Sequence, residues 1–224
     1  MSRLLDALLV DAYWGEHIVG LKIGALGHSA GGFSVLALAG GVADPQQMLR
    51  HCATTDDDRL FCQLGRDPNG LARGLAFDSG EIVAVAKSAQ PSAQALERGI
   101  EIAAAIDFDV RDERVRAVFA MAPIGLAFTP DSLRRINVPL QIVTAQHDMV
   151  LTPKYHGDWL RARLPQAMFE EVANAGHFVF MTSPLTPLLS EAGDPGENPP
   201  GFDRDSYLLR LEQQVEAFFD TRLL

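Results

Sequence analysis

The sequence predicts an α/β fold in which a mostly parallel β-sheet is covered by helices on both faces. Nearly continuous apolar runs, such as VRAVFAMAP at 115–123, alternate along the chain with segments of helical pattern. Apolar runs of this kind are typical of strands buried on both faces of a parallel sheet. The length of 224 residues suits one domain, which we expect to span residues 1–224 with a small helical and loop insertion at about 44–80.

The N-terminal part of the chain predicts a helix, a strand and a second helix, in that order. Apolar residues recur first at the spacing of an amphipathic helix, namely at Leu5, Leu8, Leu9 and Ala12. A strand follows over 21–26. The apolar run FSVLALA comes next, and the glycine pair at 40–41 is suited to end that helix.

The rest of the chain repeats the alternation of strands and helices. Strands are expected at 115–123, 138–148 and 167–177. Helices are expected at 92–106, 152–164 and 203–219. Thr152 has the residue type of an N-cap and is followed by Pro153, which favours the first helical position. The Pro- and Gly-rich segment 183–201 is expected to be a long loop.

The net charge of −10 excludes several classes of partner. An acidic chain repels phosphate backbones and anionic membrane surfaces, so we expect no nucleic-acid partner. Apolar runs stay well short of the roughly 20 residues that a membrane span needs. Asp6 and Asp11 interrupt the apolar N-terminus, which is unlike a secretory signal. The localisation stays open: cytoplasmic if the N-terminus is complete, and exported if it is truncated.

Two cysteines, Cys52 and Cys62, lie close together in HCATTDDDRLFC. Two readings remain open with equal weight: reduced thiols in a cytosolic protein, or a single local disulfide in an exported one. Metal binding is not predicted, because the pair lacks CxxC spacing and has only His51 nearby.

The stretch GHSAGG at 27–32 has the G-x-S-x-G pattern of a nucleophile on a sharp strand-to-helix turn. We expect Ser29 at the apex, with Gly27 and Gly31 present because side chains there would collide. The N–H of Ala30 would then donate to a developing oxyanion. The alternatives are a plain glycine-rich turn or a phosphate-binding loop, and the second lacks both the GxGxxG spacing and a Lys-Ser/Thr ending.

A serine nucleophile needs a base, and His177 is the prediction among six histidines. His177 follows a predicted strand and a glycine, so it belongs at the same sheet edge as the serine. His28 adjoins Ser29 and is expected to point elsewhere. His156 is expected to be exposed on a helix. The alternative for His177 is a structural histidine.

The orienting acid is predicted to be Asp148, directly after the apolar run LQIVTAQH. Its alternative role is to cap the helix that starts near Thr152. Asp107 and Asp109 precede a predicted strand instead of following one. Asp131 lies in a TPDS turn that has the pattern of a helix cap.

The order Ser29, Asp148, His177, each after a predicted parallel strand, resembles the α/β-hydrolase superfamily. Within it, the chain is similar to dienelactone-hydrolase-like and platelet-activating-factor-acetylhydrolase-like serine esterases. The motifs that carry the resemblance are GHSAGG, AMAP at 120–123, VPLQIVTAQHDMVLTP, NAGHFVF and PPGFDRDSY.

The resemblance implies a catalytic triad of Ser29, His177 and Asp148, with the Ala30 N–H in the oxyanion hole and without a cofactor. Dienelactone hydrolase uses cysteine where this chain has serine, so the implied reaction is hydrolysis of a small carboxylic ester. The predicted pocket walls are His28, Phe33 and Phe178. An amidase, peptidase or acyltransferase would share the same triad.

One departure from the family pattern concerns the N-terminus. Members have several strands before the nucleophile, whereas 28 residues precede Ser29 here. The α/β-hydrolase fold is thus expected to be N-terminally short, with strand 21–26 at an edge. We expect a homo-oligomer or a missing N-terminal segment to cover that edge. The alternative function is a non-catalytic α/β-hydrolase-like binding protein or an inactive truncated fragment.

Overall fold

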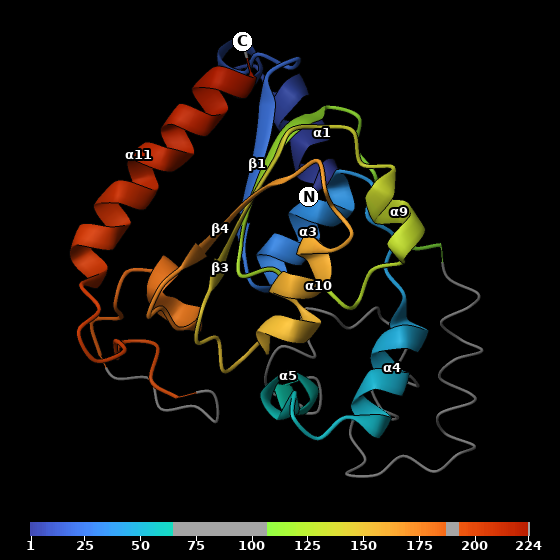
Figure 1. Cartoon of the computed structure of the whole chain (residues 1–224). Helices are drawn as coiled ribbons and strands as arrows, with labels where there is room; N and C mark the ends of the chain where they lie inside the picture. The colour runs from blue at the N-terminus through green and yellow to red at the C-terminus, as the bar shows by residue number, and fades with distance from the viewer. Residues whose placement is uncertain (65–106, 187–192, 224) are drawn as a thin grey trace.

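A four-stranded parallel sheet forms the centre of the molecule, as expected from the sequence (Figure 1). The computed structural model describes residues 1–64, 107–186 and 193–223. In this part of the chain the strands lie in the order β1-β2-β3-β4. Their bounds are Ile23–His28 for β1, Val115–Met121 for β2, Leu140–Ala145 for β3 and Met168–Val172 for β4.

The parallel register brings the carboxyl ends of the strands to one edge of the sheet. His28 pairs with Met121, Met121 also pairs with Val143, and Ala145 pairs with Val172. This edge lies at the lower side of Figure 1. The loops that leave these four strand ends therefore lie next to one another.

Helices cover both faces of the sheet, and the burial alternates along β2 to match them. Val118 and Ala120 pack with helix α3 (Ala30–Leu38) in one core cluster. Phe119 packs on the opposite face against helix α11 (Arg204–Arg222), whose Phe218 ring lies 5.6 Å away. The short helices α9 (Pro130–Arg134) and α10 (Gly157–Arg161) lie on the α3 side (Figure 1).

The N-terminal helix is shorter than the apolar spacing predicts. Helix α1 spans Ser2–Val10 and a second helix, α2, spans Trp14–His17. Asp11 ends the first and starts the second, because its carboxylate accepts hydrogen bonds from the N–H groups of Tyr13 and Trp14, each at 2.9 Å. Neither helix has a buried residue.

Strand β1 is the edge strand that the sequence predicts, although it starts two residues later than expected and runs to His28. Among the described residues, its only strand neighbour is β2. Leu26 in this strand is 47% exposed, and Leu21 just before it is 84% exposed. Much apolar surface is therefore exposed at this end of the sheet.

The described part of the predicted insertion contains two helices joined by a disulfide. Helix α4 spans Pro45–Thr54 and helix α5 spans Arg59–Leu64. Cys52 of α4 is bonded to Cys62 of α5, so of the two states that the sequence left open for this pair, the structure contains the local disulfide. The remainder of the insertion and the helix predicted at 92–106 lie outside the described residues.

Three later predictions need correction. The helix expected over 152–164 is two pieces, a 3-10 turn η1 (Pro153–Tyr155) and α10, which meet at the buried His156. Thr152 does not cap with its side chain, since its hydroxyl donates to the backbone oxygen of Asp57. The strand expected over 167–177 ends at Val172, and a second 3-10 turn, η2, spans His177–Phe180.

The loop between η2 and α11 is organised around Arg204, which is 2% exposed. Its guanidinium donates hydrogen bonds to four groups of that loop: Asn198 Oδ1, Ser183 Oγ and the backbone oxygens of Pro195 and Glu197. Burial lowers the pKa of Arg204 from its ordinary value. The side chain therefore joins both described parts of the loop to the start of α11.

Candidate active site

Ser29 is the single residue between the end of β1 and the start of α3. Its φ of 56° and ψ of −117° lie in a region that a residue other than glycine rarely adopts, at a cost of about 1–3 kcal/mol. Its N–H donates to Met121 O at 2.9 Å, which continues the pairing of β1 with β2. The turn therefore presents the side chain of Ser29 at the carboxyl edge of the sheet.

The steric requirement predicted for both flanking glycines holds for one of them. A Cβ on Gly27 would lie 2.2 Å from Gly31 O, so no side chain fits there. A Cβ on Gly31 would meet nothing within 4 Å among the described residues. A side chain at position 27 would thus collide with the backbone at position 31. It would not collide with a side chain at position 31.

The structure brings the three predicted triad residues together. His177 Nε2 lies 2.9 Å from Ser29 Oγ, and His177 Nδ1 lies 2.7 Å from Asp148 Oδ2. Because a carboxylate can only accept, Nδ1 carries the proton, and Nε2 is left to accept the hydrogen bond from the serine hydroxyl. His177 and Asp148 are buried, with 4% and 7% of their surfaces exposed.

The two oxygens of Asp148 perform separate tasks. Oδ2 faces His177, while Oδ1 accepts hydrogen bonds from the N–H groups of Val150 at 2.9 Å and Leu151 at 2.7 Å. The capping role that the sequence offered as an alternative is therefore close to what Oδ1 does, although the bonds stay within the turn itself. The Asp148 side chain is therefore held by hydrogen bonds within its own loop as well as by its contact with His177.

The loops that carry Asp148 and His177 are bonded to each other. The N–H of Gln146 donates to Val172 O at 3.1 Å, and that of His147 donates to Ala175 O at 2.8 Å. These backbone bonds extend the pairing of β3 and β4 beyond the ends of both strands. The separation between the Asp148 and His177 side chains is therefore set by backbone contacts as well as by their own hydrogen bond.

His28, predicted as a pocket wall, contacts the main chain of His177. Its Nε2 lies 2.8 Å from His177 O, and the two rings are 4.8 Å apart between centroids. Since a carbonyl accepts, Nε2–H is the donor. Burial, followed by the neighbouring His177, lowers the pKa of His28 from 6.5 to about 4, so the ring is neutral at neutral pH.

The two predicted phenylalanines, Phe33 and Phe178, are half-buried. Phe33 stacks on Phe128 with ring centroids 4.5 Å apart. Phe178 meets the His177 ring edge-on at 5.1 Å. Both pack against the apolar cluster that joins α5 to the loop after β2. Each is close to the triad while serving the packing of the core.

A second cluster of polar side chains lies near Asp148 and was missed in the sequence analysis. Asp58 Oδ2 is 2.8 Å from His51 Nε2 and 3.1 Å from His156 Nε2. The expectation that His156 is exposed is wrong, because it is 1% exposed. The run DDD at 56–58, between the two cysteines, was the sequence feature that could have indicated this cluster. A run of acidic residues, however, more often lies on a solvated surface.

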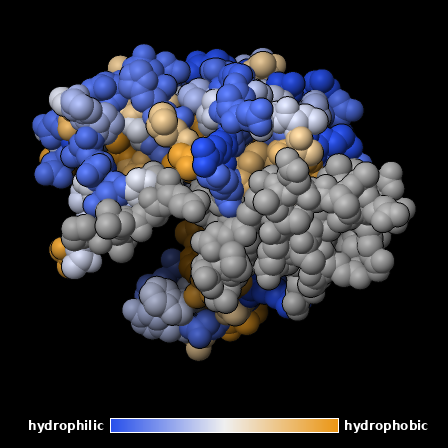
Figure 2. Space-filling view, turned by 90° about the horizontal axis from the view of Figure 1, so that it is seen from below, coloured by the Kyte–Doolittle hydropathy of each residue, from blue (hydrophilic) through white to orange (hydrophobic). Residues whose placement is uncertain are grey.

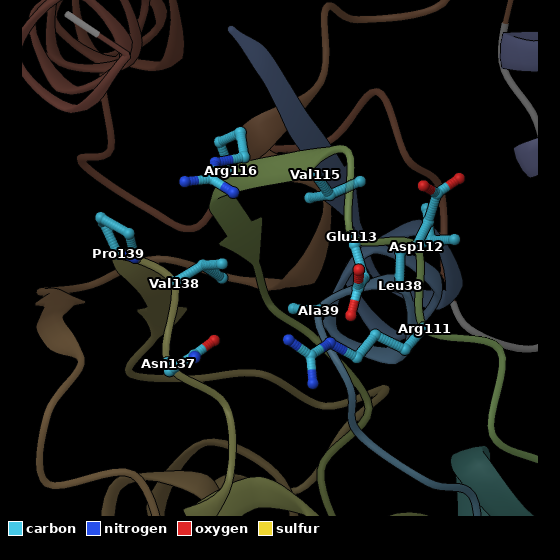
Figure 3. A pocket seen from close by; sticks show the side chains of 10 residues that line it. All are labelled: Leu38, Ala39, Arg111, Asp112, Glu113, Val115, Arg116, Asn137, Val138 and Pro139. Carbon is cyan, nitrogen blue, oxygen red and sulfur yellow. The ribbon is translucent and has the colours of Figure 1, made fainter. Parts of the chain in front are cut away.

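Figure 2 looks onto the side where the strands end, and some hydrophobic surface is visible there among hydrophilic surface. A cavity of about 300 Å³ lies at the opposite edge, where β2 and β3 begin (Figure 3). Arg111, Asp112 and Asn137 are among its lining residues, and the triad is not, so this cavity has no part in the chemistry considered below.

A model of the alpha/beta hydrolase family matches residues 2–191. The match covers most of the chain, and the chain therefore belongs to the alpha/beta hydrolase family. Membership indicates a hydrolase acting on small molecules. No curated protein sequence matches the chain.

Among the described residues, no helix is long and apolar enough to cross a membrane. Within the same residues, no group of three or more His, Cys, Asp or Glu side chains could hold a metal ion.

Proposed function

We propose that the chain is a serine esterase that hydrolyses carboxylic esters through an acyl-enzyme on Ser29. Ser29 Oγ attacks the ester carbonyl as His177 Nε2 takes its proton. The tetrahedral intermediate collapses, and His177 returns the proton to the departing alcohol. Water then attacks the acyl-enzyme with its proton passing to His177, and the acid leaves as Oγ is protonated again.

The observation that carries this proposal is the pair of contacts made by His177. A distance of 2.9 Å to Ser29 Oγ is within reach for proton transfer, and the 2.7 Å contact with Asp148 supports the tautomer that can accept that proton. Asp148 would also stabilise the imidazolium that forms. The strained backbone of Ser29 is typical of a nucleophile at a strand-to-helix turn.

The Ala30 N–H is our proposed oxyanion donor. Ala30 is the first residue of α3, so its N–H is outside the hydrogen-bond ladder of that helix. The helix also presents the positive end of its dipole to the same point. Phe33 and Phe178 support an apolar substrate group near Ser29, in keeping with the similarity to dienelactone-hydrolase-like and platelet-activating-factor-acetylhydrolase-like esterases.

The test combines labelling and turnover. A fluorophosphonate probe should label the wild type and not Ser29→Ala, and p-nitrophenyl esters of increasing acyl length should be hydrolysed by the wild type alone. If the folded wild type shows neither labelling nor turnover, the proposal fails and a binding role takes its place. Labelling without ester turnover would instead direct a substrate panel toward amides, peptides and acyl transfer.

A further inference from the structure

Asp58 is a buried carboxylate that the proposed reaction does not use. It lies just before α5, between the two cysteines of the disulfide, and 1% of its surface is exposed. Its side chain has three partners from two parts of the chain: His51 of α4, and His156 and the Thr152 N–H from the segment after β3. A buried carboxylate is costly unless its hydrogen bonds are satisfied.

The protonation of this cluster follows from the contacts around it. The Gly125 N–H donates to His156 Nδ1 at 3.1 Å, so the proton of a neutral His156 is on Nε2, which donates to Asp58. Burial lowers the pKa of His156, which favours this neutral ring. Burial opposes ionisation of Asp58, yet the hydrogen bonds from His156, Thr152 and His51 outweigh it and lower the pKa of the carboxyl.

Two of the three Asp58 partners, Thr152 and His156, belong to the segment that also holds Asp148. Asp148 Oδ1 accepts from Val150 and Leu151, and the next residue, Thr152, donates its N–H to Asp58 Oδ1 at 3.2 Å. His156 follows four residues later. The Asp148 carboxylate thus binds the N–H groups of Val150 and Leu151. The Asp58 carboxylate, which lies between the disulfide-linked helices α4 and α5, binds the next N–H group, that of Thr152.

Packing between the two carboxylate sites is tight. A cavity of only about 10 Å³ lies between Asp148 and His156, which both line it. Gly125 also approaches His156 closely, since a Cβ there would lie 2.4 Å from His156 O. A displacement of Thr152 or His156 therefore cannot be absorbed locally and would reach the loop of Asp148.

We propose that Asp58 is a positioning residue for the triad, which fixes the 148–156 segment so that Asp148 meets His177 at hydrogen-bond distance. This inference rests on the proposed function. The disulfide between Cys52 and Cys62 holds the two helices on either side of Asp58 together, and so supports the same geometry. The carboxylate acts through Asp148 and does not touch the reacting atoms.

The experiment compares Asp58→Asn with Asp131→Asn. Asp131 is an exposed acid on α9 that pairs with Arg134, outside the 148–156 segment. Rates are expressed per active site titrated with the fluorophosphonate, which removes any unfolded fraction. We expect Asp58→Asn to lower kcat about 10- to 100-fold with KM nearly unchanged, because small misplacements of catalytic groups cost that much. Asp131→Asn should stay within about 2-fold.

A second pair of variants covers the case in which Asp58→Asn does not fold. His51 contacts Asp58 from a half-buried position on α4. His51→Gln keeps an N–H donor toward Asp58 and His51→Leu does not, so kcat per titrated site should fall in the leucine variant and recover in the glutamine variant.

The outcomes separate the two proposals. Wild-type kcat per titrated site in Asp58→Asn, an equal loss in Asp131→Asn, or equal rates in both His51 variants would overturn the positioning role while leaving the esterase proposal intact. A wild type that neither labels nor turns over would overturn both.

Discussion

The His28 side chain donates a hydrogen bond to the backbone oxygen of His177 at 2.8 Å. The residue directly before the proposed nucleophile therefore holds the main chain of the proposed base. Because β1 and η2 are about 150 positions apart in sequence, this bond is one of the long-range contacts that fix the distance from Ser29 to His177. It also holds the His28 ring in a buried position, where protonation of the ring is unfavourable.

Protonation of His28 should make stability depend on pH. Its pKa is about 4 in the folded chain against 6.5 ordinarily, so between these values the unfolded chain binds more protons. The free energy of unfolding should then decrease as pH falls from about 6.5 to about 4. His28→Gln keeps a donor for His177 O and lacks this titration.

Urea unfolding of wild type and His28→Gln at pH 7.5 and 4.5 measures the effect. The wild type should lose about 2–3 kcal/mol more than the variant between these two values. Equal losses in the two proteins would show that His28 is solvated and titrates normally.

Removing the charge of Asp148 should reduce catalysis with little change in fold. In Asp148→Asn an amide faces His177 Nδ1 and favours the tautomer that cannot accept the proton of Ser29, so kcat should fall about 10⁴-fold. Asp131→Asn is the matched control, because Asp131 is exposed and pairs only with Arg134 among the described residues. Comparable kcat values in the two variants would contradict the assignment of Asp148.

The two glycines that flank Ser29 should differ in their tolerance of alanine. Gly27→Ala places a Cβ against the backbone of Gly31 and should prevent the turn from closing, with loss of both fluorophosphonate labelling and stability. Gly31→Ala adds a methyl group to open space in the first turn of α3, where alanine favours helix, and should leave thermal stability unchanged or raised. Equal destabilisation would argue against this turn geometry.

The disulfide between Cys52 and Cys62 should survive purification without reductant. Iodoacetamide should then add no mass until the protein is reduced, and two additions should follow reduction. Replacing both cysteines by serine should cost about 2–3 kcal/mol in unfolding free energy, as expected for a loop of this short length. Immediate alkylation of the untreated protein would show that the cysteines are free thiols.

The exposed edge of β1 should be covered in solution, and we expect a second copy to cover it. Light scattering would then give the mass of a dimer, and Leu26→Lys, which puts a charge on the edge strand, should shift it to the monomer. Leu209→Lys is the control, because Leu209 is also exposed but lies on α11. A monomeric wild type would contradict this prediction.

The sequence was informative where one residue type has a clear physical task. The apolar runs predicted the parallel sheet, and the serine between glycines, with an acid and a histidine after later strands, predicted which three side chains meet. It was less informative where tertiary contacts decide. His156 has the local pattern of an exposed helical residue, and only its contacts with Gly125 and Asp58 make it a buried break between two short helices.

The buried guanidinium of Arg204 has a consequence for redesign of the protein. Its four acceptors come from both described parts of the loop that precedes α11, and all of them are oxygens of that loop. One side chain thus holds the described parts of this loop to the start of α11. A graft that replaces residues 181–203 should include position 204 as well. A new loop without matching oxygens would leave the buried guanidinium of Arg204 without hydrogen-bond acceptors.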